Sequence, residues 1–172
     1  MVSTDTWDPR QYDKFQRERE QPFFDLLALV QPKPAMRVAD LGCGTGKQTR
    51  IVHDQLAARE TVGLDRSANM LADARATPQP AGPRFEVDSI EAFASDGGWD
   101  LIFSNAALHW VDDHERLLQQ LASALAPSGQ LAFQVPAQHD TLTHLLAEEL
   151  TQAEPFNSAF RRLAALATGA DP

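Results

Sequence analysis

Hydrophobic and polar positions alternate along the chain with two periods, one typical of helices and one typical of buried strands. Five short apolar runs predict strands, at residues 36–41, 61–65, 83–88, 99–105 and 129–135. Amphipathic runs between them predict helices, at residues 47–58, 67–76, 89–94 and 113–126. Strands and helices that alternate at this spacing predict an α/β fold: a doubly wound, mainly parallel sheet with helices on both faces.

The N-terminal part is predicted to be helical before the alternation begins. Asp8 suits an N-cap and Pro9 suits the first helical turn, so residues 8–20 are predicted to form a short amphipathic helix. A second helix is predicted to begin near Pro22 and to end before the sequence QPKP at residues 31–34.

The alternation stops after the last predicted strand. Residues 139–155 and 156–170 both have a helical pattern, and no strand pattern follows them. A chain of 172 residues is long enough for one cored domain and short for two. We therefore predict a single domain over 1–172, with an N-terminal helical segment at 1–35, a core at 36–136 and a helical tail at 137–172.

The charge and cysteine content narrow the choice of partners and compartment. With 24 acidic and 15 basic residues, the formal charge of −9 disfavours nucleic acid and anionic membranes. The single cysteine, Cys43, allows no internal disulfide, and it lacks the neighbours that a zinc site needs. The N-terminus has no leader pattern and no apolar run is long enough to cross a bilayer. These features predict a cytoplasmic protein without a metal, a membrane or a nucleic acid partner.

The glycine-rich sequence DLGCGTGKQT at residues 40–49 has three candidate ligands. A phosphate-binding P-loop is disfavoured, because Leu41 replaces its first glycine and Gln48 replaces its Ser or Thr. A dinucleotide-binding turn is disfavoured, because Lys47 replaces its third glycine. What remains is the pattern Asp-x-Gly-x-Gly-x-Gly, formed at the carboxyl end of the first predicted strand by Asp40, Gly42, Gly44 and Gly46.

Polar residues end the first four predicted core strands, and together they favour a cationic nucleoside. Asp40 disfavours a pyrophosphate and suits an ammonium group. Asp65, 19 positions beyond Gly46, suits both hydroxyls of a ribose. Asp88 suits the exocyclic amine of adenine, and Asn105 adds another polar group beside the glycine turn. Two neighbours of Asp88, namely Ser89 and Ile90, are expected to close this pocket.

On these motifs the chain resembles the class I S-adenosylmethionine-dependent methyltransferases, which have a Rossmann-like fold. Further stretches are similar to the trans-aconitate methyltransferase group, above all the opening WDPRQYDKF at residues 7–15 and NAALHW at residues 105–110. The resemblance implies that Gly42, Cys43 and Gly44 lie under the methionine part of the cofactor. It also implies that Asp65 binds ribose and that Asp88 binds the exocyclic amine of adenine. Met70 and Arg66 are implied to flank the adenine ring, although an apolar residue is common in the family at the position of Arg66.

The resemblance also implies a reaction, direct transfer of a methyl group to a carboxylate oxygen of a small, trans-aconitate-like acid. A carboxylate is already ionised at neutral pH, so no catalytic base is expected, and alignment and exclusion of water are expected to suffice. An aromatic lid is expected from Trp7, Tyr12 and Phe15, and His109 and Trp110 are expected beside the methyl group. Candidate cationic groups for the acid are Arg19, His109, Arg161 and Arg162.

Several alternatives stay open at this point. The lid aromatics, His109 and Trp110 also suit plain packing, and Arg161 and Arg162 also suit a solvated helix face. Compared with the family, the chain is expected to lack the last two strands, which leaves residues 129–135 at an open edge where copies can associate. A short gene product, a truncated gene model and a domain completed by a partner chain all fit this length. The alternative functions are cofactor binding without turnover and methylation of another small acid or an acyl thioester.

Overall fold

The computed structural model describes residues 16–76, 80–93, 97–137, 146 and 149–159. The chain divides into two compact units, residues 1–135 and 136–172, which are described separately. Trp7, Tyr12, Phe15, Arg161 and Arg162, for which we predicted roles, lie outside the described residues.

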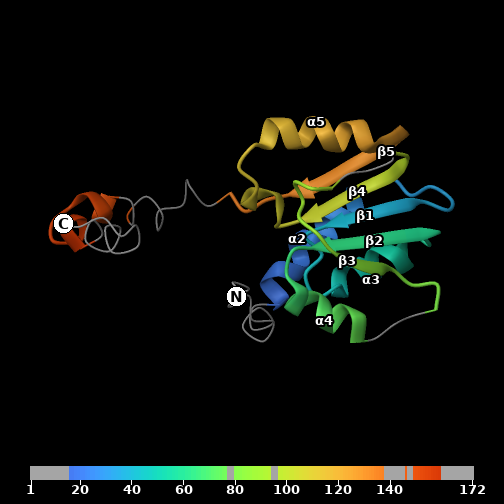
Figure 1. The fold of residues 1–172 in the computed structure, drawn as a ribbon, viewed down its shortest axis with the longest axis horizontal. Coiled ribbons are helices and arrows are strands. Elements are labelled where there is room, and N and C mark those ends of the chain that lie inside the picture. The colour runs from blue at the N-terminus through green and yellow to red at the C-terminus, as the bar shows by residue number, and fades with distance from the viewer. Residues whose placement is uncertain (1–15, 77–79, 94–96, 138–145, 147–148, 160–172) are drawn as a thin grey trace. The chain divides into compact units, whose positions relative to one another are not determined.

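A five-stranded parallel sheet forms the centre of the first unit (Figure 1). Its strands are β1 (Arg37–Leu41), β2 (Glu60–Asp65), β3 (Arg84–Val87), β4 (Trp99–Asn105) and β5 (Leu125–Gln134). The spatial order is β3-β2-β1-β4-β5, and every neighbouring pair runs parallel. The chain therefore reverses its direction of winding between β1 and β4, and open α/β sheets bind ligands at the carboxyl side of such a point.

Helices cover both faces of this sheet, which confirms the predicted fold class. The described helices of the first unit are α2 (Gln16–Leu29), α3 (Lys47–Gln55), α4 (Ala68–Ala76), the 3₁₀ helix η1 (Leu108–Trp110) and α5 (His114–Ala124). On one face, α2 and α3 pack on β1 and β4 through Phe23, Val52 and Phe103, which are all buried. On the other face, α5 packs through Leu117 and Leu121.

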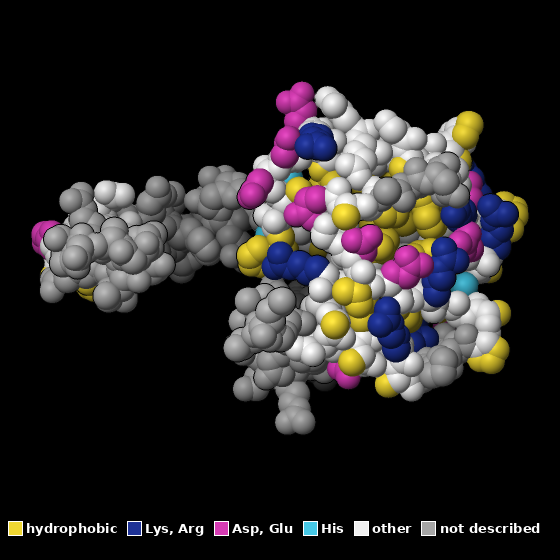
Figure 2. All heavy atoms as spheres, viewed as in Figure 1, with side chains coloured by type: hydrophobic (Ala, Val, Ile, Leu, Met, Phe, Trp, Pro, Cys, Tyr) yellow, Lys and Arg dark blue, Asp and Glu magenta, His cyan; other side chains and the backbone are white. Residues whose placement is uncertain are grey.

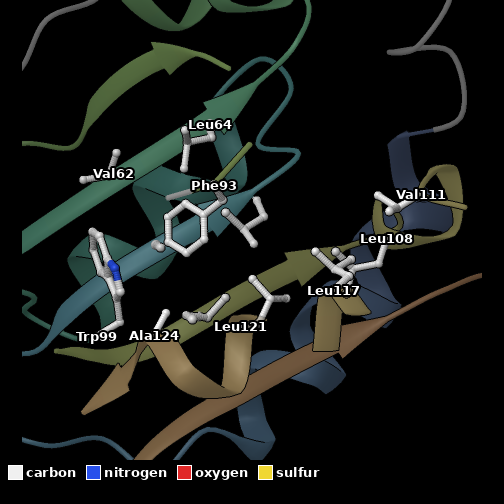
Figure 3. Close-up of a cluster of buried hydrophobic side chains, with 12 residues drawn as sticks. Val62, Leu64, Phe93, Trp99, Leu108, Val111, Leu117, Leu121 and Ala124 are labelled. Atoms are coloured by element: carbon white, nitrogen blue, oxygen red, sulfur yellow. The ribbon is translucent and has the colours of Figure 1, made fainter. Parts of the chain in front are cut away.

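The core on the α5 face depends on side chains from three kinds of segment. Figure 3 shows Phe93, from the loop after β3, between Leu64 of β2 and Leu121 of α5. Phe93 also contacts Trp99 at the start of β4, with ring centroids 5.9 Å apart. Aromatic side chains remove large apolar areas from water, so this loop is packed against the sheet although it contains no helix over its described residues.

Three of the differences from the predictions have a structural explanation. The predicted break near Pro22 is wrong, because α2 runs through this residue, which is exposed. The predicted helix over residues 89–94 is wrong over residues 89–93, where the Ser89 hydroxyl accepts from the amide of Ala92 and a short turn forms. The helix predicted to end at residue 126 ends at Ala124, and β5 begins at once because Leu125 is extended and pairs with Trp99.

Charged residues join the amino ends of the strands, at the side opposite the glycine turn. Arg37 donates to Glu60 at 2.7 Å, and Arg84 pairs with Glu60 at 2.8 Å. The Arg37 guanidinium also donates to the carbonyl of Gly97 and lies 4.2 Å from the ring centroid of Trp99. Burial opposes ionisation of Glu60, but the hydrogen bond and charge of Arg37 and the charge of Arg84 hold its pKa below the usual value. This network stabilises the end of the sheet that is far from the ligand side.

Charged side chains of both signs lie on the surface of the molecule (Figure 2). On the face in Figure 2, acidic and basic side chains are interspersed, so this face has no field of a single sign. In the second unit, residues 149–152 and 156–159 are helical, as predicted for these positions. No helix among the described residues combines the length and apolar character needed to span a bilayer.

Candidate functional site

The glycine turn after β1 is anchored on β2 by its backbone. The amides of Gly42 and Cys43 both donate to the carbonyl of Leu64, at 2.8 and 2.9 Å. The next glycine amide, of Gly44, donates to Oδ2 of Asp65 at 2.8 Å. Gly42 and Gly44 have φ values of +75° and +55°, a conformation that glycine adopts at little cost. The turn therefore leaves bare backbone facing the carboxyl end of the sheet.

A cleft lies beside this turn, at the carboxyl ends of β1, β2 and β4. It encloses about 710 Å³ when the space open to solvent at its mouth is included. Its lining comes from the glycine turn, the end of β2 with α4, the loop after β3 and the turn after β4: Gly42, Gly44, Asp65, Arg66, Met70, Ile90, Glu91, Asn105, Ala106, Ala107, Trp110 and Val111. Eight of these twelve are predicted site residues, and the other four are Glu91, Ala106, Ala107 and Val111.

Asp65 connects two walls of the cleft. Its Oδ2 accepts from the Gly44 amide, and its Oδ1 accepts from the amide of Ser67 at 2.8 Å. The two bonds fix the carboxylate at the end of β2, where it is half-buried and lines the cleft. An ionised carboxylate has about four acceptor sites, so hydroxyl groups of a ligand can still bind to it.

Asp40 lies beneath the cleft and is absent from its lining. The carboxylate is buried at 3% exposure, and its Oδ2 accepts from the Thr49 hydroxyl of α3 at 2.6 Å. Burial raises the pKa of Asp40 to about 6; the Thr49 hydrogen bond opposes this shift, and the charge of Asp65 adds to it. Asp40 therefore ties β1 to α3 and acts on the cleft through its charge.

Cys43 and Gly46 also belong to the turn but lie outside the cleft lining. Burial, followed by the charges of Asp40 and Asp65, raises the pKa of the Cys43 thiol above its usual range. The thiol is thus protonated at neutral pH, which argues against a nucleophile. Gly46 begins α3 in a left-handed conformation, and a Cβ atom there would lie 2.6 Å from the ring of Phe85. Gly46 therefore allows α3 to start close to β3.

The turn after β4 forms the opposite wall. Asn105 donates from Nδ2 to Oε1 of Gln48 at 2.9 Å and accepts at Oδ1 from Nε2 of Gln134. Ala106 follows with φ +53°, and Ala107 is buried against the glycine turn. The side chain of Asn105 is thus held from both sides at the rim of the sheet.

The loop after β3 places its residues differently from the prediction. Asp88 is exposed and lies outside the cleft lining, and its Oδ1 accepts from the amide of Ser89, which also lies outside the lining. Ile90, a predicted site residue, lines the cleft, and so does Glu91, which was not predicted. Glu91 was missed because it falls in a run predicted as a helix, and no residue pattern marked it.

His109 and Trp110 of η1 have distinct environments. Trp110 lines the cleft and is 57% exposed, so most of its surface is available at the mouth. His109 lies beside it with ring centroids 4.8 Å apart and the rings tilted by 39°, but His109 is not part of the lining. Its Nδ1 is buried and has no hydrogen-bond partner among the described residues. Burial, followed by the charge of His114, holds the pKa of His109 below its usual value. His109 is therefore neutral at neutral pH.

Two remaining predictions concern cationic groups and metals. Arg19 lies in α2, and its side chain is outside the described part of the structure. Among the described residues, no group of three or more His, Cys, Asp or Glu side chains has an arrangement that suits a metal ion.

The cleft combines bare backbone, one fixed carboxylate, an amide and an exposed indole, which suits a small polar ligand with an apolar part.

Comparison with known proteins identifies the class. The methyltransferase domain family matches residues 12–166. The chain belongs to this family.

Individual relatives share a more specific name. The chain is 44% identical over 168 residues to a trans-aconitate 2-methyltransferase of Deinococcus radiodurans, covering 97% of this chain and 64% of the relative. It is 43% identical over 160 residues to the enzyme of the same name from Variovorax paradoxus, covering 90% of this chain and 61% of the relative. The chain thus spans less than two thirds of the length of these relatives.

A solved structure gives the same assignment of the fold. An S-adenosylmethionine dependent methyltransferase from Mesorhizobium loti is 35% identical, with a TM-score of 0.61 over 68% of this chain and 53% of that protein. This likeness agrees with the Rossmann-like, parallel sheet predicted from the sequence.

Proposed function

We propose that this chain binds S-adenosylmethionine in the cleft and transfers its methyl group to a carboxylate oxygen of a small, trans-aconitate-like acid. The observation that carries the proposal is the position of Asp65, whose fixed carboxylate lines the cleft beside the bare backbone of Gly42 and Gly44. The names of the relatives, trans-aconitate 2-methyltransferase, supply the acid.

The residues of the cleft fit the parts of this cofactor. Asp65 has free acceptor sites for the ribose hydroxyls. Met70 and Ile90 offer apolar contacts for adenine, with Arg66 at the same wall. A Cβ atom on Gly44 would lie 3.2 Å from Cε of Met70. Because Gly44 has no Cβ atom, its backbone can lie close to Met70 without crowding this side chain. Asn105 and the negative charge of Asp40 suit the amino-acid end, which carries an ammonium group.

The remaining predicted contacts belong to the same proposal. Cys43 and Gly46 would support the turn from below, and Asp88 and Ser89 would reach adenine by a change in the loop after β3. Trp110, at the mouth, would shield the methyl group from water, with His109 behind it. Trp7, Tyr12, Phe15, Arg19, Arg161 and Arg162 keep their predicted roles as lid and acid-binding groups.

The proposed reaction needs orientation more than acid-base chemistry. When bound, S-adenosylmethionine would supply a methyl group on a cationic sulfur. Transfer of this methyl group to a carboxylate oxygen would form the O–C bond of a methyl ester, break the C–S bond and leave S-adenosylhomocysteine. The acceptor is already anionic, so the chain has no proton to remove. We assign no catalytic base: the Cys43 thiol is protonated, and His109 lies outside the cleft lining. The cleft residues therefore act by binding, aligning and excluding water.

A titration with a product assay tests this function. Calorimetry with S-adenosylmethionine measures binding, and mass spectrometry detects methyl esters of trans-aconitate, other small acids and an acyl thioester. Binding with methylation of trans-aconitate supports the proposal in full. Binding with ester from another acid, or without any ester, supports one of the alternatives, and no heat of binding contradicts the proposal.

The wider setting is also a proposal. We expect a cytoplasmic protein whose partner is a small carboxylate, without nucleic acid or a membrane. Self-association is proposed at the outer edge of β5, which pairs only with β4 among the described residues. Light scattering across a concentration series tests this association, and a mass that stays at one chain throughout contradicts it.

A further inference from the structure

Gln134 lies outside the cleft but contacts its wall at two points. It is the last residue of β5, and its backbone carbonyl accepts from the amide of Ala106 at 3.0 Å. Its side-chain Nε2 donates to Oδ1 of Asn105. Both Asn105 and Ala106 line the cleft, whereas Gln134 does not. One residue at the end of β5 therefore contacts two consecutive residues of the wall, Asn105 by its side chain and Ala106 by its backbone carbonyl.

The contact with Asn105 is part of a longer relay of amides. Asn105 donates from Nδ2 to Oε1 of Gln48, so hydrogen bonds run from Gln134 through Asn105 to α3. An amide that accepts on one side and donates on the other is held by both neighbours at once. The relay thus holds the Asn105 side chain between β5 and α3.

The fixed amide has unused capacity. A side-chain amide offers two N–H donors and two acceptor lone pairs. The bonds to Gln48 and Gln134 use one of each, which leaves one N–H and one lone pair on a residue that lines the cleft. A donor and an acceptor side by side match the carboxylate and ammonium groups of an amino acid.

The backbone contact acts on the neighbouring residue. Ala106 has φ +53°, which is strained for a residue with a Cβ atom. Its amide is held by the carbonyl of Gln134, and the next residue, Ala107, is packed against Gly42. The strained turn therefore depends on the end of β5 for its shape.

We propose that Gln134 is a positioning residue for cofactor binding. Acting through Asn105, it presets the wall of the cleft for the amino-acid end of S-adenosylmethionine. This inference rests on the proposed function, since it assigns a role within the same site. A preset wall raises affinity because fewer groups lose freedom on binding.

The same strand supplies a matched control. Gln130 also makes two side-chain bonds, accepting from the amide of Gln31 and donating to its carbonyl, each at 2.8 Å. Gln130 lies four residues before Gln134 on β5, and neither Gln130 nor Gln31 lines the cleft. Gln134→Met should weaken binding of S-adenosylmethionine about tenfold, whereas Gln130→Met should change it by less than about twofold.

A double-mutant cycle separates positioning from a general loss of stability. In an Asn105→Ala background, Gln134→Met should have no further effect on the dissociation constant, because its partner is gone. A merely structural role would give the same loss in both backgrounds. The thermal midpoint of each variant, measured in parallel, reports the stability change separately from the affinity.

Each outcome is decisive. If the parent chain does not bind S-adenosylmethionine, the proposed function fails. If the parent binds and Gln134→Met binds as tightly as Gln130→Met, the inference on Gln134 is overturned. Should Gln134→Met not fold by circular dichroism, Gln48→Met cuts the same relay from α3, and an unchanged affinity in that variant overturns the inference.

Discussion

The Cβ atom of Ala107 lies 2.2 Å from the position that a Cβ atom on Gly42 would take. Carbon atoms that are not bonded do not approach so closely, so the glycine turn and the turn after β4 touch only because Gly42 has no side chain. This contact joins two walls of the cleft and brings the ends of β1 and β4 together.

Gly42→Ala is predicted to destabilise the fold by more than its backbone conformation explains. Gly97 is a matched control, because it has φ +81° and nothing within 4 Å of its would-be Cβ atom. Gly97→Ala should lower the free energy of unfolding by about 1 kcal/mol, and Gly42→Ala by about 1–3 kcal/mol more. Denaturant unfolding measures both, and equal losses would show that the approach to Ala107 costs nothing.

Asp65→Asn is predicted to abolish most of the cofactor affinity. The amide loses the negative charge and one acceptor oxygen, so it cannot hold the Gly44 and Ser67 amides and also receive ribose hydroxyls. The loss of charged hydrogen bonds should raise the dissociation constant about 100-fold. The control is Asp73→Asn on the exposed face of α4. Calorimetric titration that finds both variants equal to the parent would remove Asp65 from the site.

Asp40→Asn is predicted to change how stability depends on pH. The pKa of Asp40 rises from 3.8 to about 6 on folding, so between these values the folded chain holds a proton that the unfolded chain has lost. The contribution of Asp40 to stability therefore falls as pH rises from about 4 to about 6 and then stays low. Relative to the parent, the Asn variant should gain about 2–3 kcal/mol of unfolding free energy over this interval.

The control for this pH dependence lies on the same helix as the partner of Asp40. Asp54 is exposed on α3, and Asp54→Asn is the control because it removes a carboxyl group from the surface of that helix. Unfolding in urea at a series of pH values gives the comparison. A stability curve for Asp40→Asn that runs parallel to that of the parent would mean that burial does not shift this carboxyl group.

Arg37→Met is predicted to lower stability without changing cofactor affinity. The substitution removes the ion pair with Glu60, the bond to the Gly97 carbonyl and the contact with Trp99. We expect a loss of about 1–3 kcal/mol in unfolding free energy. Arg59→Met, at an exposed position nearby, should cost less than about 0.5 kcal/mol. A weakened titration with S-adenosylmethionine would show that the two ends of the sheet are coupled.

Much of the fold follows from local pattern. The five strands and α3, α4 and α5 were predicted because apolar periodicity is strong where an element has one buried face or two. The errors lie where tertiary packing, and not local periodicity, determines whether a helix forms and where it begins or ends. Pro22 does not end α2, because Phe23 and Leu27 are buried on the same helix, and Ser89 begins a turn that lets Phe93 reach the core.

The site residues were predictable where a sequence motif sets the position of the backbone. The direction of a side chain and its hydrogen-bond partners were less predictable. Gly42, Gly44, Asp65 and Asn105 line the cleft because each stands at the carboxyl end of a parallel strand. Strand position cannot say which way a side chain points. Asp40 turns toward Thr49 under the sheet, and the bonds from Asn105 to Gln48 and Gln134 join residues 57 and 29 positions apart.

Among the described residues, the strand that carries Gln134 is also the outermost strand of the sheet on its side. Any polypeptide that pairs with this edge therefore acts on the same strand that holds Asn105 and Ala106. If pairing orders the end of β5, it strengthens cofactor binding, and thermodynamic reciprocity then requires the cofactor to strengthen pairing by the same factor. The fraction of paired chains would then rise when the cofactor binds in the cleft, and the fraction of clefts that hold cofactor would rise when chains pair.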